Sequence, residues 1–471
     1  MSTETNVQPP ATIPDTIRGT IPGTIPDTIP ATISDTVPPT SADDVAGRSR
    51  DFNRLWLGQS ISAFGTQVTT LALPLTAVLY LHASATQIGL LGAARELPVL
   101  GLMLFFGVVV DRVRRRPLMI GADLGRAVAI GAIPLLAWLG FLQMPVLYLV
   151  AFAVGCLAVI FSLAYQAYLP TLLGPDRLLS GNSRLQSTQS LSDVAGPGLA
   201  GFLVQLVRAP FALLADALSF LVSAWSIAVI RTPEPMVERD PAAGDGSQVR
   251  RVFTDIYDGL RFTVTHALLR SIAGAAAVFN VFATIMLTIF VVYAARVSHM
   301  SAGEIGVVFA GFGIGGLLAA ALLDRALGRV GPGRLLISGY AVGAAAIVSL
   351  PFVGGTFLDG SFLGGAAVTR TIIFAVVFFV AGCSIVAANI VEMTIRQAAT
   401  PNAVQGRVGA GFGFLIGALM PIAAIVAGVL GDHIGLRATL FVASAGVPFS
   451  LPWIVFSKLR HIESLDNLDP N

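Results

Sequence analysis

Apolar residues run along this chain in long segments separated by short polar connectors, from residue 54 almost to the carboxyl end. Each segment has about the 20 residues that an α-helix needs to cross the hydrocarbon core of a bilayer. The pattern therefore predicts an all-α polytopic membrane protein with twelve transmembrane helices. The predicted spans are 54–81, 86–110, 117–141, 145–169, 185–207, 209–230, 268–298, 302–326, 333–355, 370–395, 405–430 and 434–458.

Polar segments divide this series of spans. Residues 1–47 repeat Thr, Ile and Pro, and proline at this frequency excludes a helix and indicates a disordered tail. Residues 231–267 begin rich in Pro and acids and then place apolar residues at helical spacing, which predicts an amphipathic helix on the membrane surface. We expect two six-helix bundles, 48–230 and 268–460, joined by this central loop, and a short tail at 461–471.

The composition excludes a soluble protein. Hydrophobic residues make up 55% of the chain and charged residues 12%, whereas about 25% of a soluble globular domain is charged. The net charge of +2 is not gathered into a nucleic-acid patch. The sequence has no phosphate-binding Gly-Lys-Ser/Thr loop, nucleophile elbow or metal-spaced His cluster, so we expect no enzyme, no cofactor and no metal.

The distribution of basic residues predicts the orientation. Lys and Arg gather on the connectors that share one face with both termini, and those expected on the other face are Arg208, Arg296, Arg370 and Arg437. Because positive residues near span ends stay in the cytoplasm, both termini are predicted to be cytoplasmic. The expected location is the cell membrane, in contact with lipid on all sides.

The densest charge lies between the second and third spans, where residues 107–117 read GVVVDRVRRRP. This stretch is either a topology anchor alone or a gate between the two bundles. The eighth span also ends in Asp-Arg, at Asp324 and Arg325, so the feature is repeated in the second half. Duplicated halves are typical of secondary transporters with a midplane site, which favours the gate.

This stretch resembles the signature of the major facilitator superfamily. The superfamily pattern G-x-x-x-D-R-x-G-R-R/K is matched by Gly107, Asp111, Arg112, Arg115 and Arg116, whereas Arg114 replaces the usual Gly. The resemblance covers about residues 50–460. It implies two six-helix bundles, and it implies that Asp111 caps the start of the span at 405–430, near Gly406 and Arg407, because a carboxylate is favoured at a helix N-terminus.

A second resemblance lies in the fifth span. The segment SDVAGPGLAG approximates the drug:proton antiporter motif, matched by Gly196, Pro197 and Gly201. Residues 182–224 resemble the macrolide-efflux and enterobactin-exporter branch. This resemblance implies a bend that seals the span against the other half. Ordinary close packing of small residues is the alternative.

Charged residues inside the spans are functional candidates, because each costs roughly 2.5–3.5 kcal/mol to insert. Glu96 is the first candidate for proton acceptor, with Arg95 beside it and Glu392 as a second candidate. A structural ion pair with another helix is the alternative for Glu96. Asp193 is assigned to the gate network with Asp111.

Three further charges are assigned structural roles. Asp123 and Arg126 lie three residues apart on one helical face, so we expect them to pair. Asp216 lies in a span outside the expected cavity, where hydrogen bonding between helices is favoured over proton transport.

Uncharged polar residues of the spans are candidates for the substrate cavity, and contacts between helices are the alternative for each. These candidates are Gln59, Gln67, Tyr165, Gln166 and Asn280.

The pattern and the resemblances together favour a monomeric secondary exporter. We expect it to move a hydrophobic or amphipathic small organic compound, such as a drug, an antibiotic or a siderophore-like molecule, in exchange for protons by alternating access. A uniporter, an importer or a lipid flippase of the same fold remains open, as does a non-transporting membrane receptor or scaffold.

Overall fold

The computed structural model describes residues 42–110, 113–174, 177–234, 245–353, 366–401 and 404–462 of the 471-residue chain. The chain separates into two units, Met1–Val45 and Ala46–Asn471. Described residues form helices and no strands, so the predicted all-α class is confirmed. Residues 1–41 of the predicted tail and residues 463–471 lie outside the described ranges.

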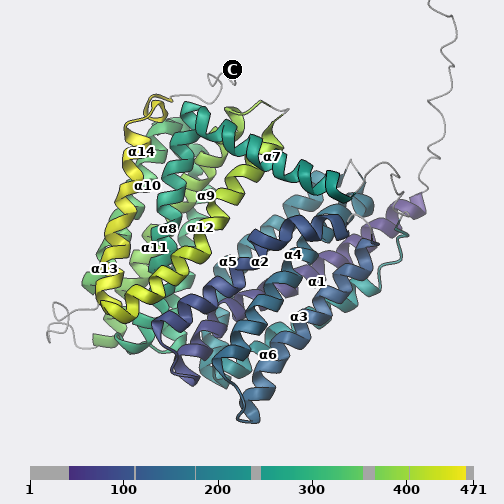
Figure 1. Ribbon diagram of the computed structural model, residues 1–471, viewed down its shortest axis with the longest axis horizontal. Helices are drawn as coiled ribbons and strands as arrows, with labels where there is room; N and C mark the ends of the chain where they lie inside the picture. Colours follow the sequence, from purple (N-terminus) through teal and green to yellow (C-terminus); the bar gives the residue numbers. More distant parts are fainter. Residues whose placement is uncertain are drawn as a thin grey trace, which may run out of the picture. The chain divides into compact units, whose positions relative to one another are not determined.

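The first group of helices, which we call the N-terminal half, follows the first six predicted spans (Figure 1). Its helices are α1 (Ala42–Leu75, continued by the π-helical turn η1, Thr76–Tyr80), α2 (Ala85–Val110), α3 (Arg115–Trp138), α4 (Met144–Leu173), α5 (Leu178–Val207) and α6 (Ala209–Ala228). Two helices begin earlier than the apolar pattern predicts. α1 begins at residue 42 instead of 54, and α5 at residue 178 instead of 185, because polar first turns extend each helix beyond its apolar run.

The second group, the C-terminal half, follows the other six spans. Its helices are α8 (Ala267–Arg296), α9 (Ala302–Val330), α10 (Pro332–Val353), α11 (Ala366–Ala398), α12 (Gln405–His433), α13 (Leu436–Gly446), the 3-10 turn η3 (Val447–Ser450) and α14 (Leu451–Val455). The last predicted span is interrupted between α13 and α14, where Pro448 and Pro452 lack the N–H of a continuous helix.

The described residues contain eleven helical segments that are long and apolar enough to cross a membrane. They coincide with every predicted span except 86–110. That span coincides with α2, of which the side chains of residues 101–110 are outside the description.

The central loop contains α7 (Asp245–Thr265), an amphipathic helix at the predicted position. α7 packs against the beginning of α12, where a side chain at Gly259 would collide with the backbone of Arg407. Asp255 pairs with the Arg407 guanidinium at 2.9 Å. One face of α7 is therefore occupied by protein.

The two halves contact each other through small residues. A Cβ atom at Gly89 of α2 would lie 2.3 Å from the carbonyl oxygen of Ala424 in α12, and a Cβ at Gly201 of α5 would lie 2.8 Å from Gly306 of α9. Such distances leave no room for a side chain, so the helix backbones touch directly.

Two hydrogen-bonded contacts also join the halves near Gly89, at the start of α2. Asp432, near the end of α12, accepts hydrogen bonds of 2.9 Å from the backbone N–H groups of Ala85 and Thr86 at the start of α2. Arg296, at the end of α8, donates to the carbonyl oxygen of Ala83. Because a carboxylate is favoured at a helix N-terminus, Asp432 fixes α2 to the C-terminal half.

Candidate functional site

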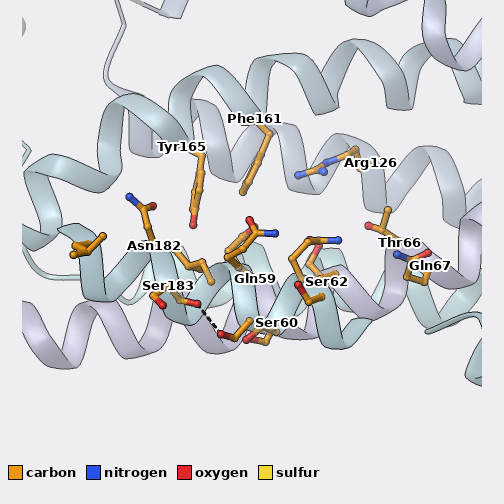
Figure 2. A pocket seen from close by; sticks show the side chains of 18 residues that line it. Gln59, Ser60, Ser62, Thr66, Gln67, Arg126, Phe161, Tyr165, Asn182 and Ser183 are labelled. Carbon is orange, nitrogen blue, oxygen red and sulfur yellow. Dashed lines mark hydrogen bonds between the residues drawn. The ribbon is translucent and has the colours of Figure 1, made fainter. Parts of the chain in front are cut away.

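A polar cavity of about 850 Å³ lies in the N-terminal half between α1, α4 and α5. Tyr165 and Phe161 project from α4 toward Gln59 and Ser62 of α1, and Arg126 of α3 points into the same space (Figure 2). The Tyr165 and Phe161 rings are stacked with centroids 6.0 Å apart. The cavity thus combines an aromatic wall with hydroxyl and amide groups.

Helical spacing explains why these polar groups share one wall. On α1, Gln59, Ser62 and Thr66 follow at intervals of three and four residues. On α5, Asn182 and Gln186 lie four residues apart, on either side of the start of the predicted span at residue 185. Residues at such spacing lie on one face of a helix, and the early start of α5 adds Asn182 and Ser183 to the polar wall.

Arg126 forms the charged floor of this cavity. Its guanidinium lies 4.5 Å from the ring centre of Phe161 and 4.4 Å from that of Phe220, a cation–π arrangement. It pairs with Asp123, as the sequence predicts. The Nε atom of Arg126 is buried and has no hydrogen-bond partner among the residues that the structure describes.

A row of polar residues on α6 lies behind this pair. Asp216, Ser219, Ser223 and Ser226 follow at intervals of three, four and three residues and are all buried. They pack against glycines of α1, since a Cβ atom at Gly65 would lie 2.1 Å from the Ser219 hydroxyl. The row therefore lies on the face that α6 turns toward α1.

Hydrogen bonds connect the cavity wall to the buried pair. The Gln59 amide donates to the Ser223 hydroxyl (2.8 Å), which donates to the Asp123 carboxylate (2.6 Å). A group that binds to Gln59 would therefore contact the Asp123–Arg126 pair through a single hydroxyl.

A second cavity, of about 310 Å³, brings four charged residues to one space: Arg95, Glu96, Arg126 and Asp216. Arg95 and Glu96 also line a third cavity of about 440 Å³, together with Thr288 of α8 and Met420 of α12. These two residues of α2 therefore lie where the halves face each other. The Arg95 guanidinium is 3.3 Å from the Thr70 hydroxyl.

Asp193 lies on α5 with its carboxylate exposed. It accepts hydrogen bonds from the amides of Gln67 (2.6 Å) and Gln189 (2.8 Å), both of which line the polar cavity. A Cβ atom at Gly313 of α9 would lie 3.0 Å from the Asp193 carbonyl oxygen. Asp193 thus lies at the cavity rim, against the C-terminal half.

The predicted cavity residues separate into two groups. Gln59, Gln67 and Tyr165 line the polar cavity. Gln166 is exposed and donates to Ser162 on its own helix, and Asn280 donates to the Ala276 carbonyl of α8. Neither lines any of the three cavities.

Glu392 is buried in the C-terminal half, 8% exposed. It accepts a hydrogen bond of 2.7 Å from the Tyr340 hydroxyl. It lines none of the three cavities.

The densest charge of the sequence is described only in part. Asp111 and Arg112 lie outside the described residues, and Gly107 lies in α2. The backbone N–H groups of Arg115 and Arg116 donate to the Glu234 carboxylate, which caps α3. The Arg116 side chain donates to carbonyl oxygens at the end of α6.

In the second half, the predicted copy of this feature lies in the last turns of α9. Asp324 and Arg325 are both exposed there, and neither forms an ion pair within the described part of the chain.

The glycines of the fifth span lie at close contacts. A Cβ atom at Gly196 would lie 2.5 Å from the Gln67 side chain, and the Pro197 carbonyl oxygen lies 2.7 Å from the Cβ position of Gly306. With Gly201, these residues bring α5 onto α9 of the other half.

Arg126 and Asp216 are the residues of this site that the sequence analysis assigned to structure. The signal that could have identified them is the polar row on α6, since four polar residues on one face of an apolar helix must face protein or a cavity. The described residues contain no group of three or more potential metal ligands.

A family model described as "Transmembrane secretion effector" matches residues 47–471. The multidrug efflux pump Tap of Mycolicibacterium fortuitum is 26% identical over 423 residues, which are 85% of this chain and 94% of that protein. Macrolide efflux protein A of Streptococcus pyogenes is 27% identical over 188 residues, 39% of this chain and 45% of that protein.

Two solved transporters share the fold. A bacterial homologue of the iron transporter ferroportin, in an inward-facing state, superposes with a TM-score of 0.63 at 15% identity, over 87% of this chain and 98% of that chain. A bacterial homologue of the lysosomal transporter Spinster, also inward-facing, gives a TM-score of 0.60 at 12% identity, over 90% of this chain and 99% of that chain.

Proposed function

This chain belongs to the transmembrane secretion effector family of the major facilitator superfamily and is a membrane efflux transporter, and on that basis we propose that it exports amphipathic organic compounds in exchange for protons. Its relatives Tap and macrolide efflux protein A are named for drug efflux. The substrate class and the driving ion are part of the proposal.

The observation that carries this proposal is the 850 Å³ cavity. Its size suits a drug-sized molecule, since small-molecule sites measure about 300–1,000 Å³. Stacked Phe161 and Tyr165 offer an apolar surface, while Gln59 and Asn182 offer amide groups. A compound with an apolar face and a polar face fits both walls.

The gate belongs to the same proposal. With both termini in the cytoplasm, the polar cavity lies toward the inner side, and the contact of Asp432 with α2 closes the outer side. In the sequence, Asp111 directly follows α2, as Asp432 lies against its start. The resemblance implies that Asp111 caps the N-terminus of α12. Asp324 and Arg325 occupy the equivalent place in the C-terminal half. In alternating access, the contact of Asp432 with α2 breaks while the contact of Asp111 with α12 forms, and the reverse.

Efflux from cells tests this function. Cells that express the chain are loaded with ethidium or labelled erythromycin, and the loss of each probe is measured with and without an uncoupler. We expect faster, uncoupler-sensitive loss than in cells with an empty vector. If expressing cells and empty-vector cells lose every dye, macrolide and siderophore of a panel at the same rate, export of organic compounds is contradicted.

The matched gate variant is Asp111→Asn, in which the arginines that fix topology remain. We expect normal membrane insertion and reduced efflux. Efflux at the wild-type rate would remove Asp111 from the gate.

A further inference from the structure

Asp216 is a buried carboxyl group that makes no direct ion pair within the described residues, although Arg95 and Arg126 line the same cavity. It is 1% exposed. Its Oδ2 accepts from the Thr69 hydroxyl (2.5 Å) and its Oδ1 from the Ser219 hydroxyl (3.0 Å). Within the part of the chain that the structure describes, no basic side chain forms an ion pair with it.

The nearby Asp123 differs from Asp216 in this respect. One oxygen of Asp123 pairs with Arg126 and the other accepts from Ser223. The guanidinium of Arg126 is therefore paired with Asp123 and not with Asp216. A buried carboxylate without such a partner costs several kcal/mol, whereas a protonated carboxyl group can remain where Asp216 lies.

The net charge of the groups around Asp216 can be balanced by one proton. Arg126 of α3 and Arg95 and Glu96 of α2 line the same cavity as Asp216, and the Thr69 hydroxyl of α1 donates to it. Asp123 belongs to the same cluster through its pair with Arg126. Asp216, Asp123 and Glu96 make three acids against two arginines. The cluster carries one negative charge in excess, and one bound proton neutralises it.

Proposed export in exchange for protons requires such a proton site, and on that basis we propose that the carboxyl group of Asp216 carries the exchanged proton. Asp216 lines the 310 Å³ cavity, so water there can accept the proton when the O–H bond breaks. The reverse step returns a proton from water to the carboxylate. No other reactant is needed.

Arg126 connects this proton to the substrate. It lines both the 310 Å³ cavity and the polar cavity, and its Nε is unpartnered. Once Asp216 loses its proton, the new carboxylate attracts Arg126 away from Asp123. That movement alters the floor of the polar cavity, so proton release and substrate binding affect each other.

Glu96 is a weaker proton carrier than Asp216. It is partly exposed and lines two cavities. Asp216 is 1% exposed and forms no ion pair within the described part of the chain, so its charged form is stabilised less than that of Glu96.

Infrared difference spectroscopy on the purified full chain tests the site without any substrate. Wild-type protein is titrated from acidic to alkaline buffer, and the carboxylic acid C=O band is recorded. We expect D216N to lack one such band, because Asn cannot ionise. E392Q is the matched control, a buried acid of the C-terminal half, and it keeps that band. An unchanged spectrum in D216N would overturn the proposal.

Transport in proteoliposomes separates this proposal from the proposed function. With labelled erythromycin, D216N should lose accumulation driven by a pH gradient but keep exchange of erythromycin across the membrane. Accumulation by D216N at the wild-type level would overturn the role of Asp216. If accumulation by the wild-type protein does not depend on the pH gradient, the proposal of proton-driven export is wrong. The infrared band then still shows whether Asp216 binds a proton.

Discussion

In the N-terminal half buried charges lie against cavities, whereas in the C-terminal half aromatic rings fill the interior. Asp123, Arg126 and Asp216 adjoin two cavities in the first half. In the second half, Phe290 is fully buried with ring centres of Phe374 and Phe378 5.5 and 4.8 Å away. The two halves therefore differ in what lies in their interiors.

The two buried acids make the difference specific. Asp216 lies on a cavity wall beside other charges, and Glu392 is paired with Tyr340 away from the three cavities. The Tyr340 ring packs edge-on against Phe279 at 5.5 Å. We infer that the N-terminal half binds substrate and proton, while the C-terminal half is the packed body against which it moves.

The largest effect is expected from removing the partner of Arg126. Asp123→Leu leaves a buried guanidinium without its counter-ion, which should lower the free energy of unfolding by about 3–5 kcal/mol. Thermal unfolding in detergent measures the loss. The double variant Asp123→Leu, Arg126→Met should recover part of it. Wild-type stability in Asp123→Leu would show that the charged pair is not what organises the first half.

The contact between the halves comes next. Gly89→Leu places a side chain against the backbone of α12, an overpacking that should cost about 1–3 kcal/mol and hold the closed end apart. We expect reduced efflux and faster labelling of a cysteine introduced at Ala83. Gly413→Leu is the control, since a Cβ atom there meets nothing within 4 Å. Equal behaviour of the two variants would refute a functional closure at Gly89.

A smaller effect is expected in the cavity wall. Gln59→Leu removes one hydrogen-bonding amide, worth about 0.5–1.5 kcal/mol, so the KM for an exported probe should rise about 2- to 13-fold. Asn280→Leu, which changes the same kind of side chain outside the three cavities, should leave the KM unchanged. A shift in both KM values, or only in that of Asn280→Leu, would place the site elsewhere.

The smallest effect is expected at Glu392. Glu392→Gln keeps an acceptor for the Tyr340 hydroxyl and removes only a charge, so the unfolding temperature should change by less than that of Gly89→Leu. The same thermal assay measures it. A loss as large as that of Asp123→Leu would mean that the C-terminal half also depends on a buried charge.

Much of the fold follows from the sequence, because the bilayer demands long apolar helices. The spans, the amphipathic α7 and the polar wall residues Gln59 and Tyr165 lie where the pattern places them. The start of α5 does not, since its first turns are polar and read as a loop. The sequence could not show that Tyr165 lines the cavity and Gln166 does not, because adjacent residues of a helix differ only in the direction of their side chains.

The sequence by itself determined the membrane-spanning helices, because they depend on local hydrophobicity. The duplication of the halves and the orientation of the termini stay predictions from the same pattern and from the basic residues. Only the tertiary structure decided which charges meet. Asp216 on α6, Thr69 on α1 and Arg126 on α3 are far apart in the chain, and their proximity depends on how glycines let α1 and α6 approach. The free energy of a buried charge depends on such neighbours from other helices, and the residue pattern along one helix does not predict which neighbours these are.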